Sequence, residues 1–168
     1  MIRAIKQVES LPESYPAVDG VAEGGLAFAW QRIEHYIAHR FAPRQVVWRI
    51  DADAGEWCPP LGPVVTISAQ QADGEPFEPE AGAMGGYVLP CGQTTVTATV
   101  GAGPVPAVVS EAVRRLAKYL AFESGLPPGV TRFSSGAFNA SIRREDITPA
   151  MAMQNSGAAD LLRTYRRV

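Results

Sequence analysis

The chain has 168 residues with a formal net charge of −2, of which 46% are hydrophobic and 19% charged, an ordinary composition for a soluble single domain. A chain of this length buries roughly two thirds of its surface without a disulfide framework, and the only cysteines, Cys58 and Cys91, form no CxxC pair. We expect a cytoplasmic protein without membrane attachment, because no apolar run reaches the roughly 20 residues of a membrane span and the N-terminus lacks a signal-peptide core.

The first predicted element is an amphipathic helix over residues 21–41. Its apolar residues recur at steps of four and three, which places them on one narrow stripe of a helix. Pro43 disfavours the helical conformation at Ala42 and predicts the end of the helix near Phe41. The stripe consists of Leu26, Trp30, Ile33, Ile37 and Phe41.

Residues 44–101 are predicted to form an antiparallel β-sheet inserted between two helices. The segments "RQVVWRID" and "TTVTATV" alternate apolar and other side chains with a period of two, as half-buried strands do. The segment "PVVTISAQQADGEPF" indicates a hairpin with Asp73 and Gly74 at its turn. Gly85 and Gly86 precede another short strand, "YVLP".

A second helix is predicted over residues 106–124, since Pro106 suits a helix start and Gly125 a helix end. Residues 125–147 are rich in Pro, Gly and Ser and are expected to form a loop or extended arm. Residues 149–168 are predicted to form a C-terminal helix or tail. The predicted fold is α+β, one domain over residues 1–168, with a small helical bundle, an inserted antiparallel sheet and a C-terminal helical tail.

The charges are unevenly distributed along the chain. Residues 50–110 contain seven acidic and no basic residues, whereas residues 132–168 contain six arginines and three acidic residues. A solvated acidic face is the simplest interpretation. The alternative is a surface that repels nucleic acid, beside a basic end that binds an acidic protein surface.

Sequence motifs for catalysis are weak. His35 and His39 have the i, i+4 spacing of helical zinc ligands, but Tyr36 stands where an HExxH motif has its glutamate. On the predicted helix both histidines lie opposite the apolar stripe. No nucleotide-binding signature or Ser-His-acid arrangement is present in the sequence. We therefore predict no enzyme, no metal and no cofactor.

The order of these elements resembles the head-tail connector, or adaptor, proteins of long-tailed phages and phage-like gene transfer agents. The resemblance covers most of the chain. Its most specific parts are "PPLGPV" at residues 59–64, the helix from Pro106, and the ending "SGAADLLRTYRRV". The chain departs from many members in a longer acidic sheet and a less regular N-terminus.

The resemblance implies a structural virion protein in the neck, present in the host bacterial cytoplasm before assembly. Such proteins form a ring of twelve subunits under the portal of a filled head and present a surface for the next tail or stopper component. DNA would pass through the ring without specific binding. Nonspecific binding to DNA is driven by basic side chains that displace counterions from the phosphates, and an excess of acidic residues near the channel would prevent it.

The C-terminal tail is the candidate portal interface. At about a dozen residues, a helix beginning at Ser156 would be marginal alone, so its apolar and basic side chains need a surface to pack against. That surface is either the portal or, in the alternative, the core of the same domain. The candidate interface residues are Leu161, Leu162, Arg163, Tyr165, Arg166 and Arg167.

Two other functions stay open from the sequence. The protein could be another virion joint, such as a stopper or tail-completion protein, which would keep the ring and change the neighbour. The more distant alternative is a metal-dependent enzyme that uses His35 and His39.

Overall fold

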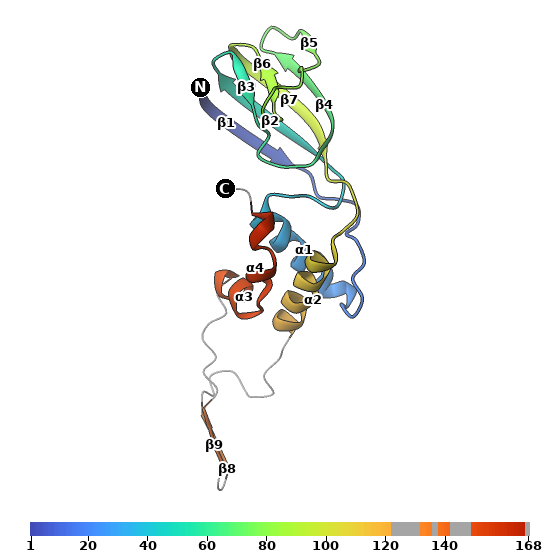
Figure 1. The fold of residues 1–168 in the computed structure, drawn as a ribbon, viewed down its shortest axis with the longest axis vertical. Coiled ribbons are helices and arrows are strands. Elements are labelled where there is room, and N and C mark those ends of the chain that lie inside the picture. The colour runs from blue at the N-terminus through green and yellow to red at the C-terminus, as the bar shows by residue number, and fades with distance from the viewer. Residues whose placement is uncertain (122–131, 136–137, 142–148, 167–168) are drawn as a thin grey trace. The chain divides into compact units, whose positions relative to one another are not determined.

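The computed structural model describes residues 1–121, 132–135, 138–141 and 149–166, and confirms the α+β class (Figure 1). The five-stranded sheet contains β1 (Ile2–Glu9), β2 (Arg44–Ala52), β7 (Gly92–Val100), β4 (Val64–Gln71) and β5 (Pro76–Phe77). Two-stranded sheets are formed by β3 (Gly55–Trp57) with β6 (Tyr87–Leu89), and by β8 (Arg132–Ser135) with β9 (Phe138–Ser141). The helices are α1 (Glu23–Ile37), α2 (Ala107–Ala121), α3 (Pro149–Asn155), α4 (Ala158–Leu161) and the 3-10 turn η1 (Arg163–Tyr165).

The chain divides into two compact units. The sheet unit comprises Met1–Pro16, Trp30–Val105 and Tyr165–Val168, and the helical unit comprises Ala17–Ala29 and Pro106–Thr164. Helix α1 contributes residues to both units. The single domain expected over residues 1–168 stays a prediction. Within the described residues, no helix is both long and apolar enough to cross a membrane.

The core of the sheet unit lies against one face of the five-stranded sheet. In β2 and β7 the even-numbered residues, except Gly92, are buried and the odd-numbered residues are more exposed, as the period of two predicts. Trp48 of β2 meets Trp57 of β3 edge to face, with ring centroids 5.3 Å apart. The predicted hairpin is also confirmed, since β4 and β5 pair antiparallel around a turn in which Asp73 Oδ1 accepts the Glu75 N–H at 3.2 Å.

Strand β1 was not predicted, and the sheet is therefore not wholly an insertion between helices. It pairs antiparallel with β2 at the edge of the sheet (Figure 1). Two features hide it from a periodicity analysis. The register shifts between Ile2 and Ala4, and the positions that face the core side include Gln7, whose Oε1 accepts the Trp48 Nε1–H at 2.8 Å, and the ion-paired Glu9.

The first helix is shorter than the predicted 21–41. It ends at Ile37 because Ala38 adopts a left-handed conformation, with φ 55°. The Arg40 N–H then donates to the Gly62 carbonyl at 2.7 Å. Phe41 belongs to the apolar stripe and is buried, yet it lies beyond the helix.

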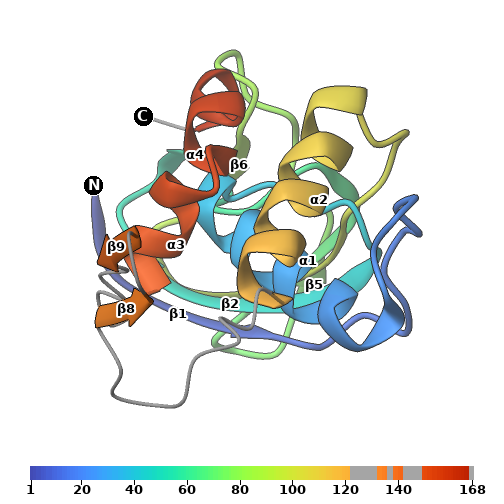
Figure 2. The ribbon, with the colours of Figure 1, turned by 90° about the horizontal axis from the view of Figure 1, so that it is seen from below.

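The helical unit is built around α2, which buries one apolar face. Val109, Val113 and Leu116 are each fully buried. Helices α3 and α4 pack on α2 (Figure 2), and the Asn155 amide of α3 donates to the Tyr119 hydroxyl of α2 at 3.1 Å. Residues 122–124, the end of the predicted helix, lie outside the described residues.

The predicted arm of residues 125–147 contains regular structure. Strands β8 and β9 pair antiparallel from Arg132 opposite Ser141 to Ser135 opposite Phe138. The other residues of this segment lie outside the described residues. These two strands are the described part of the expected loop or extended arm, which otherwise stays a prediction.

Replacement of the buried Leu116 should destabilise the protein strongly. We expect Leu116→Ala to lower the free energy of unfolding by about 2–5 kcal/mol, because it leaves a cavity in the helical unit. Lys118→Ala, on the exposed side of the same helix, should change it by less than about 0.5 kcal/mol. Urea unfolding of both variants measures this, and equal unfolding midpoints would contradict the packing of α2.

Candidate partner interface

The C-terminal segment, predicted as a helix or tail over residues 149–168, contains a break at Gly157. The Ser156 N–H donates to the Ala152 carbonyl at 3.1 Å and the Gly157 N–H to the Gln154 carbonyl at 2.9 Å, which closes α3. Gly157 has φ 73°, a left-handed conformation in which glycine commonly ends a helix. The tail is therefore a succession of α3, α4 and η1.

Leu162 is the one candidate interface residue that is fully buried in the described chain. It follows α4, which packs on α2 within the helical unit, and Ala158 at the start of α4 is also fully buried. The burial of these two side chains agrees with the alternative interpretation of the sequence, in which the tail packs on the core of its own domain. Leu162 is consequently an internal anchor of the tail.

The other candidate residues keep accessible surface where the structure describes them. Leu161 and Tyr165 are half-buried, and Arg163 is exposed. The exposed Arg166 places its guanidinium over the Tyr36 ring, 4.9 Å from the ring centroid, within the sheet unit. Arg167 lies outside the described residues. Of the five candidate residues that the structure describes, two are thus exposed arginines and two are half-buried apolar side chains.

His35 and His39 do not form a helical metal-binding pair. Because α1 ends at Ile37, only His35 is on the helix, where its Nδ1 lies 2.5 Å from the Gln31 carbonyl oxygen. The His39 ring packs against the Phe41 ring, with centroids 4.4 Å apart. Among the described residues, no group of three or more His, Cys, Asp or Glu side chains could hold a metal ion. The geometry that motivated the enzyme alternative is absent from this part of the chain.

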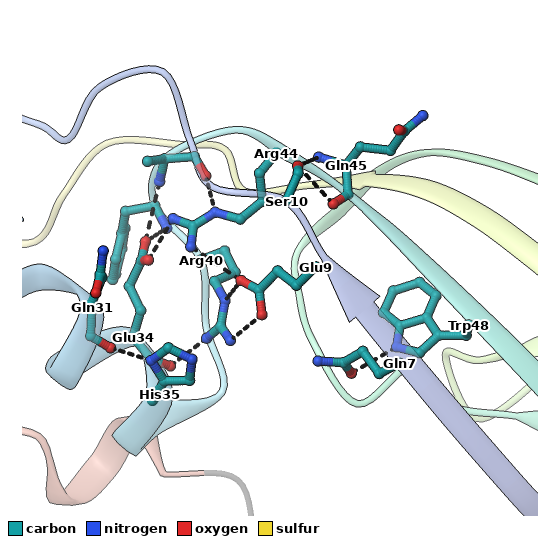
Figure 3. Close-up of polar contacts among 12 residues, drawn as sticks. Gln7, Glu9, Ser10, Gln31, Glu34, His35, Arg40, Arg44, Gln45 and Trp48 are labelled. Atoms are coloured by element: carbon teal, nitrogen blue, oxygen red, sulfur yellow. Dashed lines mark hydrogen bonds and ion pairs between the residues drawn. The ribbon is translucent and has the colours of Figure 1, made fainter.

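Two glutamates and two arginines form a buried ion-pair network in the sheet unit (Figure 3). Arg40 binds Glu9 through two hydrogen bonds, of 2.6 Å from Nε and 2.9 Å from Nη2. Arg44 bridges both carboxylates, with Nη1 3.1 Å from Glu9 Oε1 and Nη2 2.5 Å from Glu34 Oε2. The remaining oxygen of Glu34 accepts the N–H groups of Phe41 at 2.7 Å and Ala42 at 3.3 Å.

This network was missed by the sequence analysis. One signal was available, since Glu34 lies next to Ile33 and three residues before Ile37, on the apolar side of the predicted helix. A charged residue at such a position needs a buried partner. That partner is Arg44, whereas the second carboxylate of the network, Glu9, was not foreseeable because β1 was not predicted.

The pKa of Glu9 is lowered by this environment. Burial alone would raise it, but the hydrogen bonds and positive charges of Arg40 and Arg44 together outweigh burial.

At the N-terminal end of β1, the terminal ammonium group of Met1 and then Arg3 lower the pKa of Asp53.

Four acidic residues surround β5, and we call them the acidic rim. They are all exposed, and none forms an ion pair with another described residue. The acidic character of the middle of the chain is thus concentrated at the β5 edge of the sheet. The rim consists of Asp73, Glu75, Glu78 and Glu80.

No protein-family model and no curated protein sequence matches the chain. Among solved structures, a chain of the "Neck of native GTA particle computed with C12 symmetry" is 18% identical, with a TM-score of 0.53 over 95% of this chain and 96% of that one. A chain of the "Virion of native gene transfer agent (GTA) particle" is 20% identical, with a TM-score of 0.50 over 86% of this chain and 76% of that one. At these identities the similarity shows a shared fold.

The two adjacent leucines of the tail allow a matched test of its packing. Leu162→Ala should lower the free energy of unfolding by about 2–5 kcal/mol, since the side chain is fully buried. Leu161→Ala should cost less, about 1 kcal/mol, because part of that side chain is already in water. Chemical unfolding measures both values, and a Leu162 variant as stable as the native protein would show that this leucine is not an anchor.

Protonation of Glu9 should weaken the fold in acid. Its pKa is lowered from the ordinary value of 4.5, so its stabilisation is complete above that pH and is lost as the pH falls through the lowered value. Glu9→Gln should cost roughly 1–3 kcal/mol at neutral pH, and the difference from the native protein should shrink below pH 4.5.

The control for this experiment is Glu13→Gln, the same change at an exposed position. Urea unfolding across a pH series measures all three proteins. A Glu9 variant whose deficit does not change with pH would contradict the role of the ionised carboxylate.

Proposed function

We propose that this chain is a structural, non-enzymatic protein of the neck of a phage-like particle. It forms a ring around the DNA channel and joins the portal of the DNA-filled head to the tail. The observation that carries the proposal is the similarity of fold over 95% of this chain and 96% of a chain from the neck of a gene transfer agent particle. The C12 symmetry named for that neck supports a ring of twelve copies.

The surface charges of the sheet unit are consistent with a channel through which DNA slides. Residues 50–110 contain no lysine or arginine, and the acidic rim is exposed. A protein binds DNA nonspecifically by neutralising phosphates with basic side chains, so this segment offers no such binding. DNA would pass through the ring without specific contacts.

The tail supplies the contact with the portal in this proposal. Leu162 anchors the tail internally, while Leu161, Arg163 and Tyr165 keep accessible surface for the partner. Arg166 and Arg167 add positive charge at the same end of the chain.

The protein would reside in the host bacterial cytoplasm before assembly and in the virion neck afterwards, without any membrane association.

A different joint of the same neck is the second candidate function. The similarity is to a chain of a neck, and a neck also contains proteins below the adaptor, such as a stopper or a tail-completion protein. Direct binding to the portal distinguishes an adaptor from these neighbours. A ring that binds only the next tail component would assign the chain to a lower layer.

Deletion of the gene should yield filled heads without tails, visible by electron microscopy. In a portal-binding assay, the double variant Arg163→Glu and Arg166→Glu should bind at least about tenfold more weakly, because it reverses two charges at the interface. The difference should diminish as the salt concentration rises. Lys118→Glu, a charge reversal at an exposed position of α2, is the control. Tailed particles that form without this protein would refute the proposed function.

A further inference from the structure

Among the described residues, the five-stranded sheet has unpaired strand edges on both of its sides. We propose that in the ring β1 of one copy pairs with β4 of the next, so that the sheet continues from subunit to subunit. This inference rests on the proposed function, since a ring places identical copies side by side. It adds the surfaces by which the copies recognise each other.

In the part of the chain that the structure describes, no strand pairs with the outer edge of β1. In an antiparallel pair, residues whose backbone groups bond the partner strand alternate with residues whose groups point away. The Ser10 N–H donates to the Gln45 carbonyl of β2 at 2.9 Å, so the alternation directs the N–H groups of Ile5, Gln7 and Glu9 away from β2. Such a row of free backbone groups is a template for another strand.

Strand β4 offers the matching edge on the opposite side of the sheet. Its pairing with β5 is limited to Ala69 opposite Phe77 and Gln70 opposite Pro76. Residues 64–68 therefore have β7 on one side and no strand on the other among the described residues. Val65, Thr66 and Ser68 are exposed along this edge. The free stretch is as long as residues 5–9 of β1.

The strand directions fit this pairing. Neighbours in the order β1, β2, β7, β4 are all antiparallel, so β4 runs opposite to β1 in the same sheet. A rotation about an axis parallel to the strands keeps their directions. It therefore presents β1 of the next copy antiparallel to β4, which continues the alternation of the sheet.

The charges fit the same orientation. The first half of β1 contains Arg3 and Lys6, and Lys6 lies directly opposite Arg49 of β2. In the antiparallel arrangement residues 5–9 lie beside residues 64–68, so Lys6 lies next to β5, and the nearest member of the acidic rim is Glu78, directly after β5. Two cations opposite each other destabilise an isolated sheet, and the acidic rim of the neighbouring copy would neutralise them.

The apolar side chains are matched along the rest of the two strands. Val8, near the end of β1, is 58% exposed, and Val65, near the start of β4, is 54% exposed. The antiparallel arrangement brings these ends together. The contact would remove both valines from water while the backbone groups of both edges form hydrogen bonds.

Sedimentation velocity of the purified protein over a concentration series tests the pairing. The native chain should form species larger than its 18.0 kDa monomer. Lys6→Glu and Glu78→Lys should each weaken association about threefold to tenfold, and the double variant should recover most of the loss. The control is Lys118→Glu, the same charge reversal on α2, which should associate as the native chain does.

A backbone variant tests the strand edge itself. Ile5→Pro removes an N–H that points away from β2, a position where an edge strand tolerates proline, and should weaken association about tenfold or more. Ile5→Val keeps the N–H and should behave as the native chain. Thermal unfolding verifies that each variant is folded. Association of Ile5→Pro and the charge reversals at native strength would overturn the proposal, as would a native chain that stays monomeric throughout.

Imaging of the particle neck separates this inference from the proposed function. A ring of this chain in which β1 meets β4 of the next copy supports both. A ring in which β1 faces solvent overturns the strand pairing and leaves the function intact. A neck that lacks this chain overturns the proposed function.

Discussion

The sheet unit depends on the neutral ion-pair network of Glu9, Glu34, Arg40 and Arg44. Transfer of an ion from water to a protein interior costs several kcal/mol, so these groups are tolerable only together, with matched charge and satisfied hydrogen bonds. Arg40 and Arg44 are 1% and 6% exposed, and Glu34 is fully buried. The network connects side chains of β1, α1 and β2, three elements that lie apart in the sequence. The ion pairs of Glu9, the last residue of β1, therefore hold that end of the strand against Arg40 and Arg44.

The same network determines how the chain leaves the first helix. After Ala38 turns the backbone, the N–H groups of Phe41 and Ala42 would lack helical partners, and the Glu34 carboxylate accepts both. Arg44 Nε donates to the Ala42 carbonyl at 3.1 Å, which holds the other side of this connection. A buried backbone group without a partner is costly, so Glu34 acts as a local cap and as a member of the ion-pair network.

The period of the apolar residues predicted the elements that have one apolar face. It missed the elements in which polar side chains with specific partners occupy positions on the core side. Strands β2 and β7 and helix α2 were foreseeable because one face of each is apolar. Strand β1 was not, since Gln7 and Glu9 face the core side through specific partners. In the tail, the sequence identified Leu161 and Leu162 as anchors, but the pattern could not decide which one is buried, because that depends on the break at Gly157. The shared fold supports the proposed neck function, whereas the residues that contact the portal stay a prediction.

Two open edges of opposite charge also explain why copies would form a ring instead of a pair. A contact of β1 with β1 of a second copy would bring Lys6 near its own counterpart, which is unfavourable, and a contact of β4 with β4 would offer the acidic rim no cation. The head-to-tail contact of β1 with β4 is the one that brings opposite charges together. A head-to-tail contact uses two different surfaces, so every added copy presents a new free edge, and the assembly ends only when the rotation closes. Closure pairs every edge, and the strand edges that would make a free sheet prone to aggregation become the joints of the ring.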